Sequence, residues 1–115
     1  MYRNPELRLQ DILESIELIN KYISDVSVAK FSGDFKLQDA VLRRLEIIGE
    51  AAKNIPDSFR DELKGVPWRK ITGMRDMLTH EYFGIDAVRV LQTIKEDLPQ
   101  LDSAIKNFLN DKNHQ

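Results

Sequence analysis

The sequence predicts an all-α protein, an up-and-down bundle of four to five helices. Apolar residues recur at steps of three and four along most of the chain, which is the period of a helix with one buried face. No stretch alternates apolar and polar residues for long, as a half-buried strand would, and there is no internal repeat. Because 115 residues suffice for one core, we expect a single domain over residues 1–111 and a polar tail at 112–115.

The first helix is expected to begin after Asn4, which can cap it, with Pro5 at the first helical position, where its missing N–H costs nothing. We expect this helix to fray near Val28. Within residues 30–34, Gly33 is predicted to break the chain, and Asp34 or Ser32 is predicted to cap the next helix. The apolar stripe of the first helix consists of Leu9, Ile12, Leu13, Ile16, Ile19, Ile23 and Val26.

The second helix is expected to extend through residue 55, where Pro56 stops it. Its small residues Gly49, Ala51 and Ala52 allow another backbone to approach closely, and packing inside the bundle is the favoured explanation over a dimer contact. Glu50 lies among them. The sequence leaves open whether Glu50 is simply exposed to solvent, as most glutamates are, or hydrogen-bonds a residue of the site.

A short helix is predicted over residues 57–64, closed by Gly65, and a longer one from Pro67 to Gly84. Gly73 inside this longer helix costs about 1 kcal/mol relative to alanine. It therefore favours a close helix contact or a ligand at this point, and the alternative is a tolerated packing glycine.

The last helix is expected to be capped by Asp86 and kinked by Pro99. His114 lies in the polar tail, so we assign it no role. The apolar stripe of this helix consists of Val88, Leu91, Ile94, Leu98, Leu101, Ile105 and Phe108.

Composition excludes several classes of protein. The chain has no cysteine, so it has neither a disulfide framework nor a thiolate metal site. No apolar run approaches the roughly 20 residues of a membrane span, and the first residues lack the apolar core of an export signal. We therefore expect a cytoplasmic protein without a membrane partner. A net charge of −2 disfavours an extended DNA-coating surface but allows a local basic patch.

Four polar residues within a short stretch are the candidates for a functional site: Arg75, Asp76, His80 and Tyr82. An arginine presents a planar fork that matches two phosphate oxygens, and a histidine can act as both base and acid near neutral pH. Asp76, four residues before His80, could orient the imidazole or raise its pKa. The simpler alternative is that Arg75 forms a surface ion pair, with His80 partly buried and Tyr82 at the rim.

Helical geometry bears on how these residues could act together. On an ideal α-helix Arg75 and His80 lie about 140° apart, whereas Arg75 and Tyr82 are nearly on one face. A twofold dimer would instead bring two arginines and two histidines together, so we expect a homodimer. One histidine and two carboxylates on one helix do not complete a zinc site, and we predict no metal.

In these residues the chain resembles the HEPN superfamily and, more closely, its HepT-like branch. The most specific match is Arg75-Asp76-Met77-Leu78-Thr79-His80-Glu81-Tyr82, which fits the R-x4-H-x-Y motif of the family, although Asp76 stands where the family often has asparagine. Supporting matches are Leu45-Glu46-Ile47-Ile48-Gly49-Glu50-Ala51, Pro67-Trp68-Arg69-Lys70-Ile71 and Tyr82-Phe83-Gly84-Ile85-Asp86.

The resemblance implies a HEPN-like dimer with two motifs facing each other across a cleft, and a metal-independent endoribonuclease. It implies Arg75 and His80 as catalytic residues, Asp76 in support, no cofactor, and the role of toxin beside a minimal nucleotidyltransferase antitoxin in a type VII-like pair. It also implies that this antitoxin neutralises the toxin by transferring AMP to Tyr82. Two alternatives stay open: a catalytically inactive helical partner that binds or regulates the nucleotidyltransferase, and a plain dimerisation domain.

Overall fold

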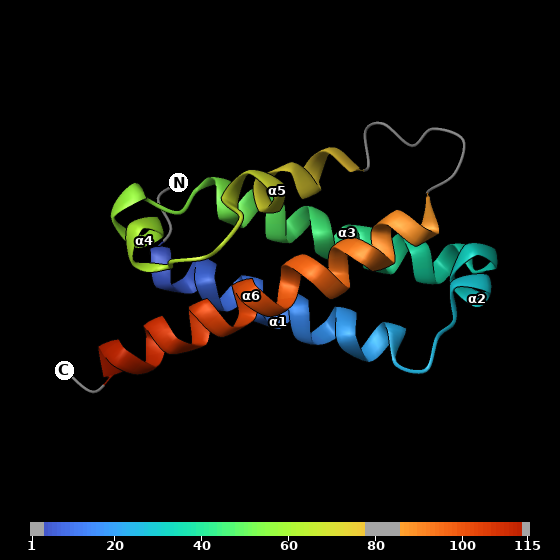
Figure 1. Ribbon diagram of the computed structural model, residues 1–115, viewed down its shortest axis with the longest axis horizontal. Helices are drawn as coiled ribbons and strands as arrows, with labels where there is room; N and C mark the ends of the chain where they lie inside the picture. The colour runs from blue at the N-terminus through green and yellow to red at the C-terminus, as the bar shows by residue number, and fades with distance from the viewer. Residues whose placement is uncertain (1–3, 78–85, 114–115) are drawn as a thin grey trace.

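Helices of alternating direction build the molecule in the computed structural model, which describes residues 4–77 and 86–113 (Figure 1). The elements are α1 (Pro5–Ile23), α2 (Val28–Gly33), α3 (Phe35–Lys53), α4 (Asp57–Glu62), α5 (Trp68–Thr72), the 3₁₀ helix η1 (Gly73–Met77) and α6 (Ala87–Asn113). In Figure 1, α1 and α5 run in one direction and α3 and α6 in the other. The described residues form no strand, so the prediction of an all-α fold is confirmed, with six α-helices in place of the expected four to five.

The first helix begins as predicted and ends earlier than predicted. Asn4 caps α1, because its side-chain oxygen accepts a hydrogen bond of 2.8 Å from the backbone N–H of Glu6, and Pro5 follows. The helix ends at Ile23 and not near Val28, since Asp25 adopts a left-handed φ of 60° that an α-helix cannot accommodate.

The predicted break and cap before the next helix are found at Gly33 and Asp34, but the residues that precede them form a helix, α2, that the sequence did not predict. Ser27 caps α2 by accepting a 3.1 Å hydrogen bond from the N–H of Lys30. Phe31 is fully buried, and the Gln38 amide donates hydrogen bonds to the carbonyls of Phe31 and Ser32 at 2.7 and 2.9 Å. Tertiary packing of one aromatic ring therefore stabilises a helix that has only 6 residues.

The middle of the chain follows the sequence closely. Asp34 caps α3 by accepting a 3.0 Å hydrogen bond from the N–H of Leu37, and α3 ends at Lys53, two residues before the predicted end. The short helix α4 follows. Gly65 has a φ of +81°, a conformation that favours glycine, which explains why the chain turns there.

The predicted continuous α-helix from Pro67 is wrong for residues 73–77, and its predicted continuation to Gly84 lies outside the described residues. The α-helical part, α5, ends at Thr72, and the chain tightens into η1 from Gly73. Ile71 in α5 and Met74 in η1 are three positions apart, which places them on the same side of the helical segment, and both side chains are buried. A Cβ added at Gly73 would meet no atom within 4 Å, so the expected close contact is not found there.

The close contact occurs at Gly49 instead. A Cβ at this position of α3 would lie 2.8 Å from the backbone nitrogen of Arg75 and 3.3 Å from the carbonyl oxygen of Thr72. The small residue thus allows the backbone of η1 to pack directly on α3, which confirms the prediction of tight packing inside the bundle.

The last helix spans one long side of the molecule. Asp86 caps α6 as predicted, since its side chain accepts a 3.1 Å hydrogen bond from the N–H of Arg89, and the helix continues through Pro99. Val88, expected in the core, is exposed. At the other end α6 extends to Asn113, and Lys112 pairs with Glu6 at 3.3 Å.

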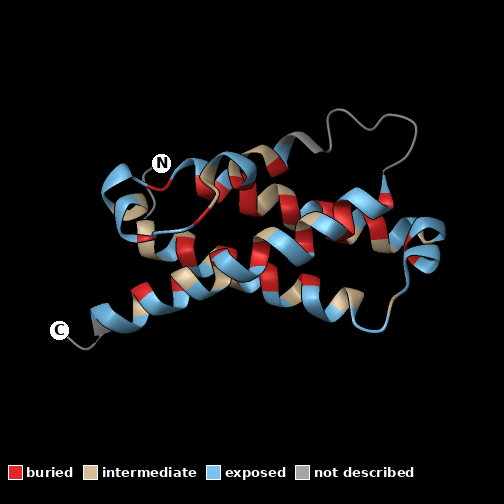
Figure 2. Cartoon of the chain, viewed as in Figure 1, coloured by how far each residue is buried: buried red, intermediate tan, exposed pale blue. Residues whose placement is uncertain are grey.

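The core lies between the long helices, as the buried positions in Figure 2 show. No helix among the described residues is long and apolar enough to cross a membrane. The largest fully buried side chains come from every helix except α4 and from the turn that follows α4, and they are Phe31, Leu9, Ile12, Ile19, Leu45, Ile48, Leu63, Ile71, Met74, Leu98, Leu101 and Ile105.

We predict that Gly49→Ala destabilises the protein. Alanine has the higher helix propensity by about 1 kcal/mol, but overpacking costs about 1–3 kcal/mol because the methyl group would press on the backbone of Arg75. Urea unfolding should therefore show a net loss of about 1 kcal/mol, which is the middle of the overpacking cost less the gain in helix propensity.

Gly33→Ala is the matched control, because a Cβ there would meet nothing within 4 Å. We expect this variant to unfold at the same urea concentration as the wild type or a higher one. Equal stability of Gly49→Ala and the wild type would contradict the backbone contact.

Candidate active site

The predicted phosphate-binding residue, Arg75, lies on η1 with its side chain 48% exposed. One of its terminal nitrogens lies 2.9 Å from a carboxylate oxygen of Glu50, whose side chain is 52% exposed. Glu50 is thus both exposed and paired with a residue of the predicted site, which answers the question that the sequence left open. An ion pair with this exposure contributes no more than about 1 kcal/mol to stability, so the guanidinium is available to an anion that competes for it.

The backbone beneath Arg75 is held by packing. Met74, the preceding residue, is 1% exposed, and Ile71 is fully buried one turn earlier. Gly49 contacts the same backbone from α3. The arginine is therefore mounted on a packed element rather than on a loop, which favours a fixed position for its guanidinium.

The remaining residues predicted for the site, the side chain of Asp76 with His80 and Tyr82, lie outside the part of the chain that the structure describes. Their roles stay predictions. The angle of about 140° between Arg75 and His80 assumed an α-helix, and it no longer follows, because Arg75 lies on a 3₁₀ turn with about 120° per residue.

Beside Arg75 lies a hollow of about 590 Å³ that we call the basic hollow. Four of its lining side chains are cations, and none is an acid. Sequence reasoning assigned no role to three of them, because they are distributed over three separate helices and only the fold brings them together. The lining residues are Lys53, Arg60, Arg69, Thr72, Gly73 and Arg75.

Arg60 is the most constrained of these cations. Its guanidinium donates a 2.7 Å hydrogen bond to the carbonyl oxygen of Ala52 in the last turn of α3, and its Cζ atom lies 5.1 Å from the centre of the Trp68 ring. The negative end of the α3 dipole and the face of the indole both stabilise a cation there. Arg60 therefore joins α4 to α3 and α5 as well as lining the hollow.

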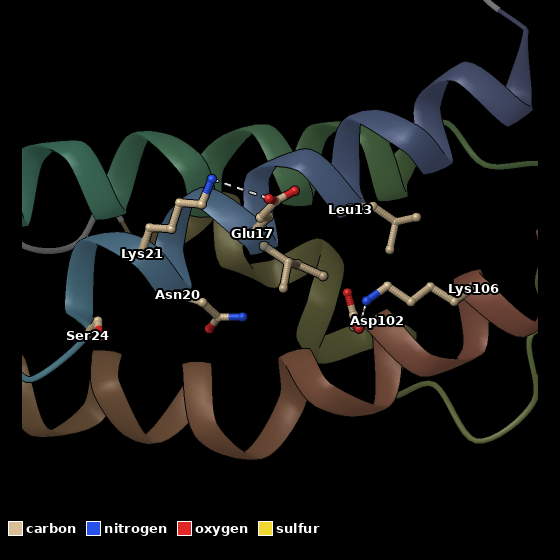
Figure 3. Close-up of a pocket in the computed structure, with 8 residues that line it drawn as sticks. Leu13, Glu17, Asn20, Lys21, Ser24, Asp102 and Lys106 are labelled. Atoms are coloured by element: carbon tan, nitrogen blue, oxygen red, sulfur yellow. Dashed lines mark ion pairs between the residues drawn. The ribbon is translucent and has the colours of Figure 1, made fainter.

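A larger groove of about 740 Å³ runs between α1 and α6 (Figure 3), and its charges are already balanced. Lys21 pairs with Glu17 at 3.3 Å, and Lys106 pairs with Asp102 at 2.9 Å. This groove offers no unpaired cation to a phosphate. Among the described residues no cluster of three or more histidines and acids could hold a metal ion.

Comparison with known proteins identifies the family of this chain. The model of the family described as "Ribonuclease HepT-like" matches residues 12–108. A "Probable ribonuclease HepT" of Thermococcus cleftensis is 50% identical over 102 residues, which cover 88% of this chain and 92% of that protein. A "Putative RNase" of Caldanaerobacter subterraneus is 40% identical over 107 residues, 93% of this chain and 96% of that protein.

A third relative is longer. A "Gamma-glutamylcyclotransferase and putative RNase" of Methanocaldococcus jannaschii is 43% identical over 115 residues, which cover 98% of this chain and 52% of that protein, so this chain spans about half the length of that relative. No solved structure matches the chain. Since the family model covers most of the sequence, and the Thermococcus relative aligns along nearly its full length, the chain belongs to the HepT-like ribonuclease family.

Proposed function

We propose that this protein is a metal-independent endoribonuclease that acts in the cytoplasm as the toxin of a type VII-like pair with a nucleotidyltransferase antitoxin. The observation that carries the proposal is the placement of Arg75: its backbone is packed on α3, its guanidinium is half exposed, and a hollow lined by cations adjoins it. Membership of the HepT-like ribonuclease family supports RNA as the substrate. We propose that residues 1–111 form one domain.

In the proposed reaction the ion pair between Arg75 and Glu50 breaks, and Arg75 binds the scissile phosphate instead. His80 removes the proton from the ribose 2′-hydroxyl, whose oxygen then forms a bond to phosphorus, while the bond from phosphorus to the 5′-oxygen breaks. That oxygen takes a proton from an imidazolium. The products are a 2′,3′-cyclic phosphate and a 5′-hydroxyl, and Arg75 stabilises the charge that builds up on the phosphoryl oxygens in between. Asp76 would support His80 by orienting its ring.

We predict that His80→Ala and Arg75→Ala each lower the RNA cleavage rate by about 10²-fold or more, because proton transfer and oxyanion stabilisation each contribute that much. Single-turnover cleavage of a labelled RNA measures the rate, and mass spectrometry of the products identifies the cyclic phosphate. A chelator should leave the rate unchanged.

Arg43→Ala is the control, since Arg43 forms an exposed pair with Glu46 on α3 and lines no part of the proposed site. We expect it to cleave at the wild-type rate. Cleavage that survives loss of His80, or stops when chelator is added, contradicts the mechanism. A fully folded protein that never cleaves RNA would favour the inactive regulatory partner.

The proposal includes a homodimer, because one chain has a single histidine outside its C-terminal tail and the reaction uses both a base and an acid. We predict that light scattering at micromolar concentration gives twice the chain mass of 13.4 kDa. A monomer that cleaves RNA would refute the shared cleft.

Control by the antitoxin is proposed to occur at Tyr82. Transfer of AMP to its phenolic oxygen would add a phosphodiester that Arg75 can bind, and this anion would repel and displace the RNA. We predict an AMP-sized mass increment after incubation with the partner, ATP and Mg²⁺, with loss of nuclease activity and no change in helical content. Tyr82→Phe should gain no increment and stay active in the presence of the partner. An unchanged increment on Tyr82→Phe would assign the modification to another residue.

A further inference from the structure

The basic hollow has the composition of an anion site in a chain that is acidic overall. Its cations come from the end of α3 (Lys53), from α4 (Arg60), from α5 (Arg69) and from η1 (Arg75). The net charge of the whole chain is −2, so this grouping is a local feature and not a consequence of a basic composition. Like charges gathered in one hollow repel each other, and an anionic ligand would relieve that repulsion.

Two other hollows formed by described residues have mixed charge. The hollow between η1 and α6 contains Lys70 and Arg89 together with Glu96 and Asp97. The groove in Figure 3 has two lysines and two acids that are already paired. In contrast to these two, the basic hollow has no acidic side chain among its lining residues.

Two of the cations are free to bind a ligand. Within residues 4–77 and 86–113, neither Lys53 nor Arg69 has an acidic side chain within ion-pair distance, and both are exposed. Arg60, by contrast, is held by Ala52 and Trp68. The α3 dipole explains a cation at Lys53 or Arg60, but Arg69 lies on a different helix, and no described contact accounts for it.

We propose that the basic hollow is a second phosphate subsite, in which Lys53 and Arg69 bind the RNA backbone next to the phosphate held by Arg75. Arg75 lines the hollow, so a strand whose scissile phosphate meets this arginine continues directly into it. Arginine and lysine contacts to phosphate carry no base information. The subsite therefore raises affinity and sets the path of the strand without selecting its sequence. This proposal rests on the proposed ribonuclease function.

The test measures RNA binding in the full chain carrying His80→Ala, so that no cleavage occurs. Fluorescence anisotropy with a labelled oligouridylate is recorded over a series of KCl concentrations. Lys53→Gln/Arg69→Gln removes two cations from the hollow. Each phosphate contact to a single strand contributes about 0.7 to the slope of log affinity against log salt. We therefore expect the slope to fall by about 1.4 and the affinity at about 0.1 M salt to fall by roughly 25-fold.

Lys70→Gln/Arg89→Gln is the matched control, because it removes the same charge from the neighbouring mixed hollow. We expect its affinity to remain within about threefold of the parent protein, the change that a diffuse charge effect would give. All variants should melt at the parent temperature, since the substituted side chains are exposed.

Equal losses in the two double variants, or no loss in Lys53→Gln/Arg69→Gln, would overturn the subsite. It would also be overturned if that variant kept its RNA affinity but bound the partner nucleotidyltransferase more weakly, since the hollow would then be a docking surface. A different outcome would refute the proposed ribonuclease function without refuting the subsite. A wild-type protein that binds RNA through the hollow but does not cleave it refutes the nuclease and leaves the subsite in place.

Discussion

The contact of α3 with the backbone of Arg75 at Gly49 is the constraint on which the candidate site depends. A Cβ at position 49 would lie only 2.8 Å from the backbone nitrogen of Arg75. The two backbones can therefore approach this closely only because Gly49 has no side chain. The next residue, Glu50, reaches the guanidinium of the same arginine at 2.9 Å. Two consecutive residues of α3 thus position Arg75 at both ends, first its backbone and then its charged group.

The 3₁₀ helix η1 also helps to position Arg75. Met74 and Arg75 are neighbours in sequence, yet one is buried and the other half exposed. Met74 lies three positions after Ile71 and is buried on the same side, and the arginine that follows it turns outward beside the hollow. The energy of packing therefore comes from apolar groups next to the site, and the arginine itself remains available for a ligand.

Sequence reasoning predicted the parts of this structure that depend on local interactions. The caps Asn4, Asp34 and Asp86 and the turn at Gly65 were found where the sequence placed them. The helix around Phe31 and the change to 3₁₀ at Gly73 were missed, because both depend on side chains that pack against distant helices. The basic hollow could not be read from the sequence for the same reason. Its cations are dispersed along the chain and meet only after folding.

The two guanidiniums near the hollow illustrate different uses of the same group. Arg60 donates to a backbone carbonyl and stacks on an indole, contacts that an incoming phosphate would have to replace at a cost in folding stability. Arg75 has only an exposed carboxylate as its partner among the described residues, and such a pair contributes about 1 kcal/mol or less. A phosphate oxygen can take the place of Glu50 without disturbing the core. The weakness of the Arg75–Glu50 pair would suit this arginine to its proposed role of binding and releasing a phosphate, while Arg60 is held by its contacts with Ala52 and Trp68.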